Sequence, residues 1–169
     1  MGARLLYGWN VAAAEWLPMA VDATGRLRIS PTPRSSMRVE RVAPNQSIPS
    51  GANTLIQFNN VIYDVLGEWN PATFLFTATI AGKYIVTAGM YMAPAVAARI
   101  YQLSIARNVP QIGAMRQHSS VALEMAMTVS APTDLAVGDI VWAAAFHTSG
   151  VARDIVANPI NFLAVERVG

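Results

Sequence analysis

The stretch FLFTATIAGKYIVTAGMYM, residues 74–92, decides the fold class. Apolar side chains recur in it at every second position, first at 74, 76, 78 and 80 and then, after Ala81-Gly82-Lys83, from 84 to 92. A repeat of about two residues places these side chains on one face of a β-strand, whereas a helix would need a repeat of about 3.6. The sequence therefore predicts two consecutive strands, each with an apolar face.

The same repeat continues through the rest of the chain. Alternate positions are apolar in residues 101–105 and again in residues 121–129. Residues 140–146 are apolar throughout, which is typical of a strand buried on both faces, and Trp142 is expected to fill core volume. A last strand is predicted at 160–165. Many short strands without a helix predict an all-β sandwich or barrel.

The pair Gly138-Asp139 marks a turn before the strand at 140–146. Glycine adopts backbone conformations that other residues disfavour, and aspartate offers a side-chain acceptor for backbone N–H groups. We therefore expect a structural role for this aspartate.

The N-terminal part of the chain has a different pattern. Residues 16–21 and 26–29 have the length of short strands, and Asp22-Ala23-Thr24-Gly25 between them suits a type I turn. This predicts a hairpin, with a third strand expected at residues 5–7. Such a small sheet buries little surface, so it is expected to need a partner on which to dock.

The segment that follows is rich in residues that disfavour regular structure. Residues 30–53 contain four prolines and five serines, which argues against both a helix and a central strand. Within it, only Met37–Val42 is expected to enter a sheet, at an edge. We therefore divide the chain into an N-terminal arm, residues 1–41, a linker, residues 42–53, and a main domain, residues 54–169.

The composition indicates assembly. Only 13% of the residues are charged, whereas 53% are hydrophobic. Because so few charged side chains cannot cover a monomer in the usual way, apolar surface is expected to meet another copy of the chain. No apolar run reaches the roughly 18 residues of a membrane span, and residues 1–16 lack the unbroken hydrophobic segment of a signal peptide. Cysteine is absent, which excludes disulfides and thiolate chemistry.

The N-terminal arm is basic and aromatic. Six arginines and three acidic residues give residues 1–41 a net charge of +3, against +2 for the whole chain. Arginines beside aromatic rings could stack on single-stranded nucleic acid, but these do not form a Lys/Arg cluster. We favour docking on a neighbouring protein, because Trp, Tyr and Arg anchor protein interfaces. The docking residues we predict are Leu5, Tyr7, Trp9, Trp16, Arg26 and Arg28.

No pattern in the sequence is typical of catalysis or metal binding. His118 and His147 lie in separate segments, and neither has a carboxylate or a second histidine at ligand spacing. His118-Ser119-Ser120 places a hydroxyl beside an imidazole, but neighbours on a strand rarely face each other and no nucleophile-elbow motif surrounds them. Paired carboxylates and a Gly-rich phosphate loop are also missing. We expect no enzyme, no cofactor and no metal.

A set of short motifs follows the order of a known domain family. The motifs are residues 58–64 (FNNVIYD), Trp69, Phe74, Phe76, residues 82–84 (GKY), residues 135–142 (LAVGDIVW) and residues 161–165 (NFLAV). Together they resemble the jelly-roll domain shared by the C1q and TNF families, although Ala164 stands where that family's closing strand has glycine. The resemblance spans residues 54–168.

This resemblance implies a ten-strand jelly roll that assembles as a homotrimer, burying one apolar sheet face of each subunit. Some C1q-like domains bind calcium through loop carboxylates, but no acidic loop cluster occurs here, so a calcium site is not expected. Candidates for the trimer interface are aromatic and methionine residues of alternating strands, and for each the alternative is a place in the subunit's own core: Tyr84, Met90, Met92, Tyr101 and Met125.

The N-terminal arm has a second, shorter resemblance. Residues 5–10 (LLYGWN) and 21–29 (VDATGRLRI) look like the openings of structural proteins in tailed bacteriophages. Joined to a cysteine-free, C1q-like body, they indicate a virion component that is synthesised in the host cytoplasm.

Two functions follow from these resemblances. The favoured one is a capsid decoration, or cement, protein whose arm binds the major capsid protein at the capsid surface. The alternative is a tail-fibre or receptor-binding head protein that recognises the host surface. Residues 107–119 and 148–159, expected to be loops, carry no aromatic ring for stacking on sugars, which favours decoration. A polysaccharide hydrolase is disfavoured because it would need paired carboxylates.

Overall fold

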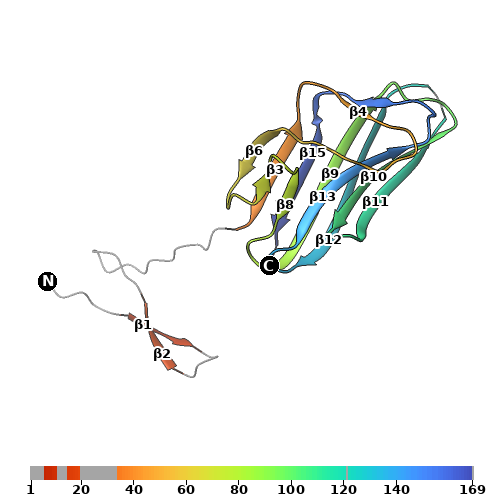
Figure 1. Ribbon diagram of the computed structural model, residues 1–169. Helices are drawn as coiled ribbons and strands as arrows, with labels where there is room; N and C mark the ends of the chain where they lie inside the picture. The colour runs from red at the N-terminus through yellow and green to blue at the C-terminus, as the bar shows by residue number, and fades with distance from the viewer. Residues whose placement is uncertain (1–5, 11–14, 20–33, 121, 169) are drawn as a thin grey trace. The chain divides into compact units, whose positions relative to one another are not determined.

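The computed structural model describes residues 6–10, 15–19, 34–120 and 122–168 (Figure 1). Every regular element in these ranges is a β-strand. The chain divides into two compact units, residues 1–32 and 33–169. The all-β fold class predicted from the alternating apolar positions is confirmed.

The first unit contains a two-stranded antiparallel sheet. Strand β1 (Leu6–Asn10) pairs with β2 (Glu15–Met19), and Trp9 lies opposite Trp16. The prediction joined residues 16–21 to 26–29 and added a third strand at residues 5–7, which β1 overlaps. Four residues separate β1 from β2, and such a short connection closes an antiparallel pair at little cost in chain entropy. The predicted turn and the strand after it lie outside the described residues.

The larger sheet of the second unit is antiparallel and centred on β9. Strand β9 pairs with β12 along one side, and with β15 and β14 along the other. Strand β15 then pairs with β3, β3 with β6, and β14 with β4. The strands are β3 (Ser36–Arg41), β4 (Gln46–Ile48), β6 (Asn60–Asp64), β9 (Gly82–Ala93), β12 (Met125–Leu135), β14 (Arg153–Ile155) and β15 (Asn158–Arg167).

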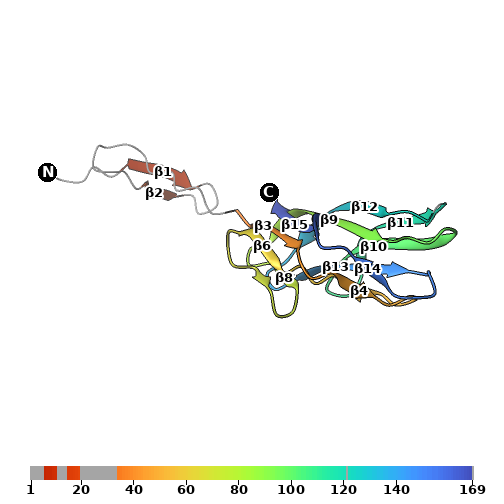
Figure 2. The same ribbon diagram turned by 90° about the horizontal axis from the view of Figure 1, so that it is seen from above.

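The smaller sheet packs against the larger one as a second layer (Figure 2). Its order is β11, β10, β13, β8 and β7, and β5 pairs with another part of β13. Several strands are only two or three residues long, so the described residues of the sandwich contain more strands than the ten that the resemblance implies. The strands are β5 (Thr54–Leu55), β7 (Trp69–Asn70), β8 (Leu75–Thr77), β10 (Arg99–Arg107), β11 (Gln111–Ser119) and β13 (Ile140–His147).

The hydrophobic core lies between the two sheets. Alternate side chains of β9 and β12 point inward from the larger sheet and meet those of β10 and β13. Its largest fully buried side chains include Tyr84 and Tyr101. The Tyr84 hydroxyl donates to the Ile80 carbonyl at 2.6 Å, and the Tyr101 hydroxyl accepts from the Val96 N–H at 2.7 Å. A buried hydroxyl without a hydrogen-bond partner destabilises the fold, so these two bonds allow the tyrosine side chains to be buried in an apolar core.

The segment predicted to be an arm and linker contributes to the larger sheet. Strand β3 lies between β15 and β6, and β4 lies at an edge beside β14. Met37 and Val39 point into the core and are fully buried, whereas Pro44 and Pro49 lie outside the strands. The predicted boundary after residue 41 therefore falls at the end of a sheet strand, and the second unit begins at residue 33 instead.

Strand β13 is not buried on both faces as predicted. Val141, Ala143 and Ala145 point into the core. Trp142 and Phe146 lie on the outward face and are half-buried. The prediction that Trp142 fills core volume is therefore wrong. Ala144, between these two rings on the outward face, is 9% exposed, so an apolar run can also mark a strand with only one face in the core.

Other predicted boundaries also shift. Strand β12 begins at Met125, Leu123 before it is 64% exposed, and Val121 lies outside the described residues. The expected loop at 107–119 contains β11, and the one at 148–159 contains β14. Both are edge or near-edge strands with polar residues on them, which a search for alternating apolar positions does not find.

The turn predicted at Gly138-Asp139 is confirmed. Gly138 has φ of 90°, a left-handed conformation that favours glycine. Asp139 Oδ2 accepts from the Ala136 N–H at 3.0 Å, and Oδ1 accepts from Asn108 Nδ2 at 2.8 Å. The bond from Asn108, followed by that from Ala136, lowers the pKa of the Asp139 carboxyl. The aspartate thus links this turn to the end of β10.

Candidate functional site

The five residues predicted for the trimer interface all lie inside the subunit: Tyr84, Met90, Met92, Tyr101 and Met125. Met125 is 7% exposed, and the other four are at most 1% exposed. All five belong to the core between the sheets. The structure thus agrees with the alternative, a place in the subunit's own core. Contact with a second copy would use other side chains of these strands.

The outward face of β12, β9 and β15 carries no charged side chain over most of its length. Ser130, Thr87 and Ala164 are neighbours in one row across these strands, and Thr128, Gly89 and Phe162 in the next. We call this surface the sheet face. Its residues are Ile85, Thr87, Gly89, Tyr91, Ala126, Thr128, Ser130, Pro132, Ile160, Phe162 and Ala164.

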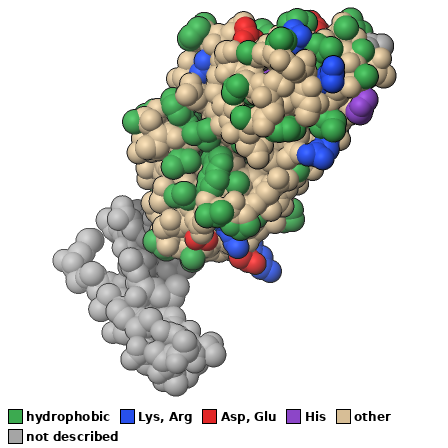
Figure 3. Space-filling model, turned by 45° about the vertical axis from the view of Figure 1, so that its right-hand side comes forward, with side chains coloured by type: hydrophobic (Ala, Val, Ile, Leu, Met, Phe, Trp, Pro, Cys, Tyr) green, Lys and Arg blue, Asp and Glu red, His purple; other side chains and the backbone are tan. Residues whose placement is uncertain are grey.

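An uncharged outer face is unusual for an antiparallel sheet. Where such a face meets water, polar and charged side chains normally alternate with the buried ones. Here Ile85 and Ile160 are 42% and 48% exposed. Elsewhere on the surface, the side of the molecule seen in Figure 3 shows hydrophobic side chains with scattered charged ones. Depletion of charge is the compositional mark of the centre of a protein interface.

The charged groups of β3 and β15 beside the sheet face have partners within the subunit. On β3, Arg38 Nη2 lies 3.0 Å from Glu40 Oε1, and the Arg38 guanidinium carbon lies 4.3 Å from the centre of the Phe162 ring. The Tyr63 hydroxyl donates to Glu166 Oε1 at 2.9 Å. Partial burial, and then this hydrogen bond, raise the pKa of Tyr63. Arg38 and Glu40 thus neutralise each other, whereas the Glu166 carboxylate is held by the hydroxyls of Tyr63 and Ser36.

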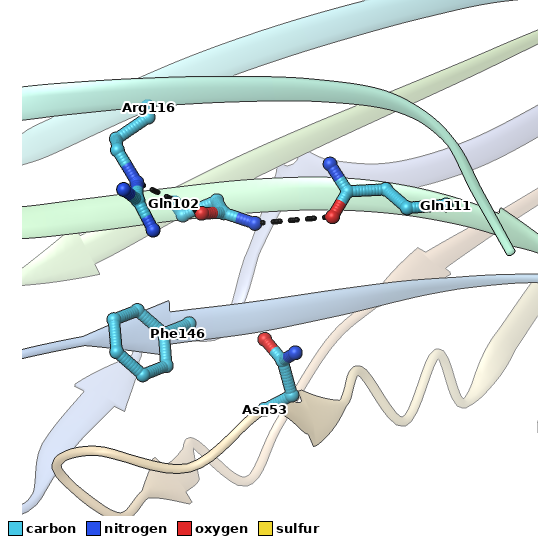
Figure 4. A pocket seen from close by; sticks show the side chains of 5 residues that line it. All are labelled: Asn53, Gln102, Gln111, Arg116 and Phe146. Carbon is cyan, nitrogen blue, oxygen red and sulfur yellow. Dashed lines mark hydrogen bonds between the residues drawn. The ribbon is translucent and has the colours of Figure 1, made fainter.

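A polar recess of about 330 Å³ opens on the outward face of the smaller sheet (Figure 4). It is lined by Asn53, Gln102, Gln111, Arg116 and Phe146. Arg116 lies opposite Gln102 on neighbouring strands, and Gln102 lies opposite Phe146 on the next. Arg116 Nε donates to Gln102 Oε1 at 3.0 Å, and Gln102 Nε2 donates to Gln111 Oε1 at 3.4 Å. The lining therefore holds one positive charge, three amides and an aromatic ring.

Sequence reasoning missed this recess because its residues come from four separate segments. A signal for it is present on β10, where Gln102 and Ser104 alternate with the apolar Tyr101, Leu103 and Ile105. Both polar side chains are buried, at 9% and 5% exposed, although they point away from the core. Polar residues that are buried on an outward face indicate that neighbouring side chains shield them from solvent.

The histidines do not form a chemical site. Within the described residues, no three His, Cys, Asp or Glu side chains are grouped to hold a metal ion. His147 is fully buried and stacks on Tyr101, with 5.8 Å between ring centres. Its Nδ1 accepts from the Ser149 N–H at 3.3 Å, so Nε2 carries the proton and donates to the Ile48 carbonyl at 2.9 Å. His118 is exposed on β11.

The predicted docking residues of the arm are only partly covered by the structure. Tyr7 and Trp9 lie on β1, and Trp16 lies on β2. Leu5, Arg26 and Arg28 lie outside the described residues. Docking of the arm remains a prediction from the sequence.

Solved structures with similar folds are C1q and TNF proteins. The globular domain of zebrafish complement 1qA is 18% identical, with a TM-score of 0.55, covering 78% of this chain and 93% of its own. Eiger TNF from S. frugiperda is 11% identical, with a TM-score of 0.56 and coverages of 82% and 94%. Murine APRIL is 12% identical, with a TM-score of 0.61 and coverages of 80% and 99%. No curated protein matches the chain in sequence.

These likenesses define the class of protein as an all-β jelly roll of the C1q/TNF type. The family model of the C1q domain matches residues 41–163. The chain belongs to the C1q domain family. Its described residues contain no helix that could cross a membrane.

Proposed function

We propose that the chain is a non-enzymatic structural protein that forms a homotrimer through the sheet face and decorates the capsid of a virus particle. The uncharged sheet face is the observation that supports assembly most directly. The shorter resemblance of residues 5–10 and 21–29 to phage structural proteins supports the location on the particle. The separation of residues 1–32 from the jelly roll supports a division between attachment and assembly.

The physical argument for assembly rests on the composition of the sheet face. Thr87 and Ser130 satisfy each other through a hydrogen bond of 3.0 Å, so their hydroxyls can be covered without losing a partner. Small side chains such as Ala126 and Ala164 let a second surface approach closely. Ile85 and Ile160 supply exposed apolar area whose removal from water favours association.

The substitution Thr87→Lys is expected to dissociate the trimer. It places a charge without a partner at the centre of the sheet face, which would be desolvated on association. We expect the dissociation constant to rise roughly 30-fold, or about 2 kcal/mol, because the long side chain can partly escape to water. Analytical ultracentrifugation over a range of protein concentrations measures this change.

The matched control is Thr77→Lys, at an exposed position of β8 in the smaller sheet. This variant should keep the oligomeric state of the natural chain. A monomeric natural chain, or equal behaviour of the two variants, would contradict assembly through the sheet face.

Attachment to the particle is tested by removing residues 1–32. Ser35 accepts from the Arg167 N–H through its carbonyl, so a deletion that stops before residue 33 leaves the sheet intact. The shortened chain should form the same oligomer as the full chain but should not bind capsids that lack the protein. Three arms per trimer would bind together, so losing them should abolish attachment rather than weaken it slightly. Capsid binding by the shortened chain would refute the arm as the attachment device.

The position on the particle distinguishes decoration from the alternative, a tail-fibre or receptor-binding head protein. Cryo-electron microscopy of purified particles should show trimeric knobs on the icosahedral shell. Density confined to a tail or fibre tip would favour the alternative, and the polar recess on the smaller sheet would then be the first surface to test for host recognition.

A further inference from the structure

We propose that the polar recess between Arg116, Gln102 and Phe146 binds a saccharide unit that carries a carboxylate, of the uronic acid kind. This is independent of how the chain assembles and of where it sits on a particle. The recess lies on the smaller sheet, whereas the sheet face belongs to the larger one. Its volume of about 330 Å³ is at the lower end of the range for ligand sites, which fits a single sugar unit.

The charge in the recess selects an anion. Arg116 has no ion-pair partner among the described residues, and its Nε is held by Gln102 Oε1. This bond orients the guanidinium and leaves its two terminal amino groups to bind a ligand. A guanidinium presents N–H groups in a planar fork that matches a carboxylate, which makes the pairing stronger and more directional than a contact with a neutral oxygen.

The hydrogen-bond chain through the recess has a defined direction. Gln102 is 9% exposed, and its amide accepts from Arg116 and donates to Gln111 Oε1. Gln111 then has its NH₂ group left to donate, and the Asn53 amide offers a donor and an acceptor from the opposite side (Figure 4). Hydroxyl groups both donate and accept, so a ring with several hydroxyls matches amides arranged in this way.

The Phe146 ring completes the match to a sugar. It is half-buried and lies on the same side of the recess as Asn53 in Figure 4. An aromatic face can cover the C–H groups of a pyranose ring while the hydroxyls reach the amides. A nucleic acid fits less well, because a backbone of phosphates calls for several cations and the recess offers one.

The experiment titrates the full chain with D-glucuronate and, separately, with the neutral methyl glucoside, by isothermal calorimetry or NMR chemical-shift mapping. Glucuronate should bind in the millimolar range, as expected of a small polar ligand at an open site, and methyl glucoside at least tenfold more weakly. Saturable binding should shift the amide signals of Gln102, Gln111 and Arg116. A glucuronate-containing oligosaccharide that binds at least as tightly as the free acid indicates a polymer as the source, whereas weaker binding indicates the free acid.

The variant Arg116→Gln should lower the affinity for glucuronate at least tenfold and bring it close to that for methyl glucoside. Arg99→Gln, an exposed arginine on β10 outside the recess, is the matched control and should bind as the natural chain does. Because Arg116 is exposed, circular dichroism should show both variants folded. Equal affinity for the two sugars, no saturable binding of glucuronate, or unchanged binding by Arg116→Gln would each overturn the proposal.

Discussion

Replacing Gly89 by valine should lower the free energy of unfolding by about 4 kcal/mol. Gly89 lies at the centre of β9, and a Cβ built on it would come 2.5 Å from the Ile160 carbonyl oxygen and 2.6 Å from the Phe162 ring. The ring could rotate away, but the carbonyl belongs to the backbone of β15, so relief requires the strand to move. The cost therefore reaches beyond that of ordinary overpacking. Urea denaturation monitored by tryptophan fluorescence measures it.

A matched control for this prediction lies two residues away on the same strand. Thr87→Val adds no volume on the same outward face and loses only the hydrogen bond to Ser130. It should cost about 1 kcal/mol or less. If Gly89→Val and Thr87→Val lowered the free energy of unfolding by similar amounts, the backbone of β15 could move at Ile160 at little cost. That result would contradict the steric argument.

Replacing Glu68 by leucine should cost a similar amount, about 4 kcal/mol. Glu68 is 3% exposed, and its carboxylate accepts three hydrogen bonds, from the Ser35 hydroxyl and from the N–H and hydroxyl of Thr79 at 2.7 and 2.6 Å. Ser35 precedes β3 of the larger sheet and Thr79 follows β8 of the smaller one, so these bonds join the two layers. Leucine would leave the fully buried Ser35 hydroxyl without this acceptor.

The variant Glu68→Gln separates hydrogen bonding from packing. Its amide keeps one acceptor oxygen and nearly the same volume, so the loss should be roughly 1–2 kcal/mol, measured by the same urea denaturation. A larger loss for glutamine than for leucine would show that the site tolerates an apolar side chain and that the hydrogen bonds are not the source of stability.

The regions predicted well and those predicted poorly differ in one physical respect. Strand β9 could be found from sequence because one of its faces is apolar at nearly every inward position. Strand β11 could not, because most of its residues are exposed and, apart from Ile112 and Met115, they are polar or small. Alternation is a signal of burial, so it fails for strands whose burial is slight.

The candidate sites show the same division. The predicted interface residues were chosen for being large and apolar, and such side chains are taken first by the subunit's own core, as Met90 and Tyr101 are. The sheet face mixes small or hydroxyl-bearing residues such as Thr87 and Ala164 with larger ones such as Phe162, so it has no distinctive pattern along the chain. Only the pairing of β12, β9 and β15 brings them into one surface.

The sequence by itself determined the all-β class, the central strands, the turn at Gly138-Asp139 and the family, because periodic burial and short ordered motifs are local properties of a chain. The tertiary structure decided which outward residues form the sheet face, how Glu68 joins the two layers, and that Asn53, Gln102 and Arg116 meet in one recess. These depend on strand order and register, which are set by contacts between distant segments. A short strand such as β5, which brings the loop of Asn53 to β13, has no signal of its own until the sheet exists.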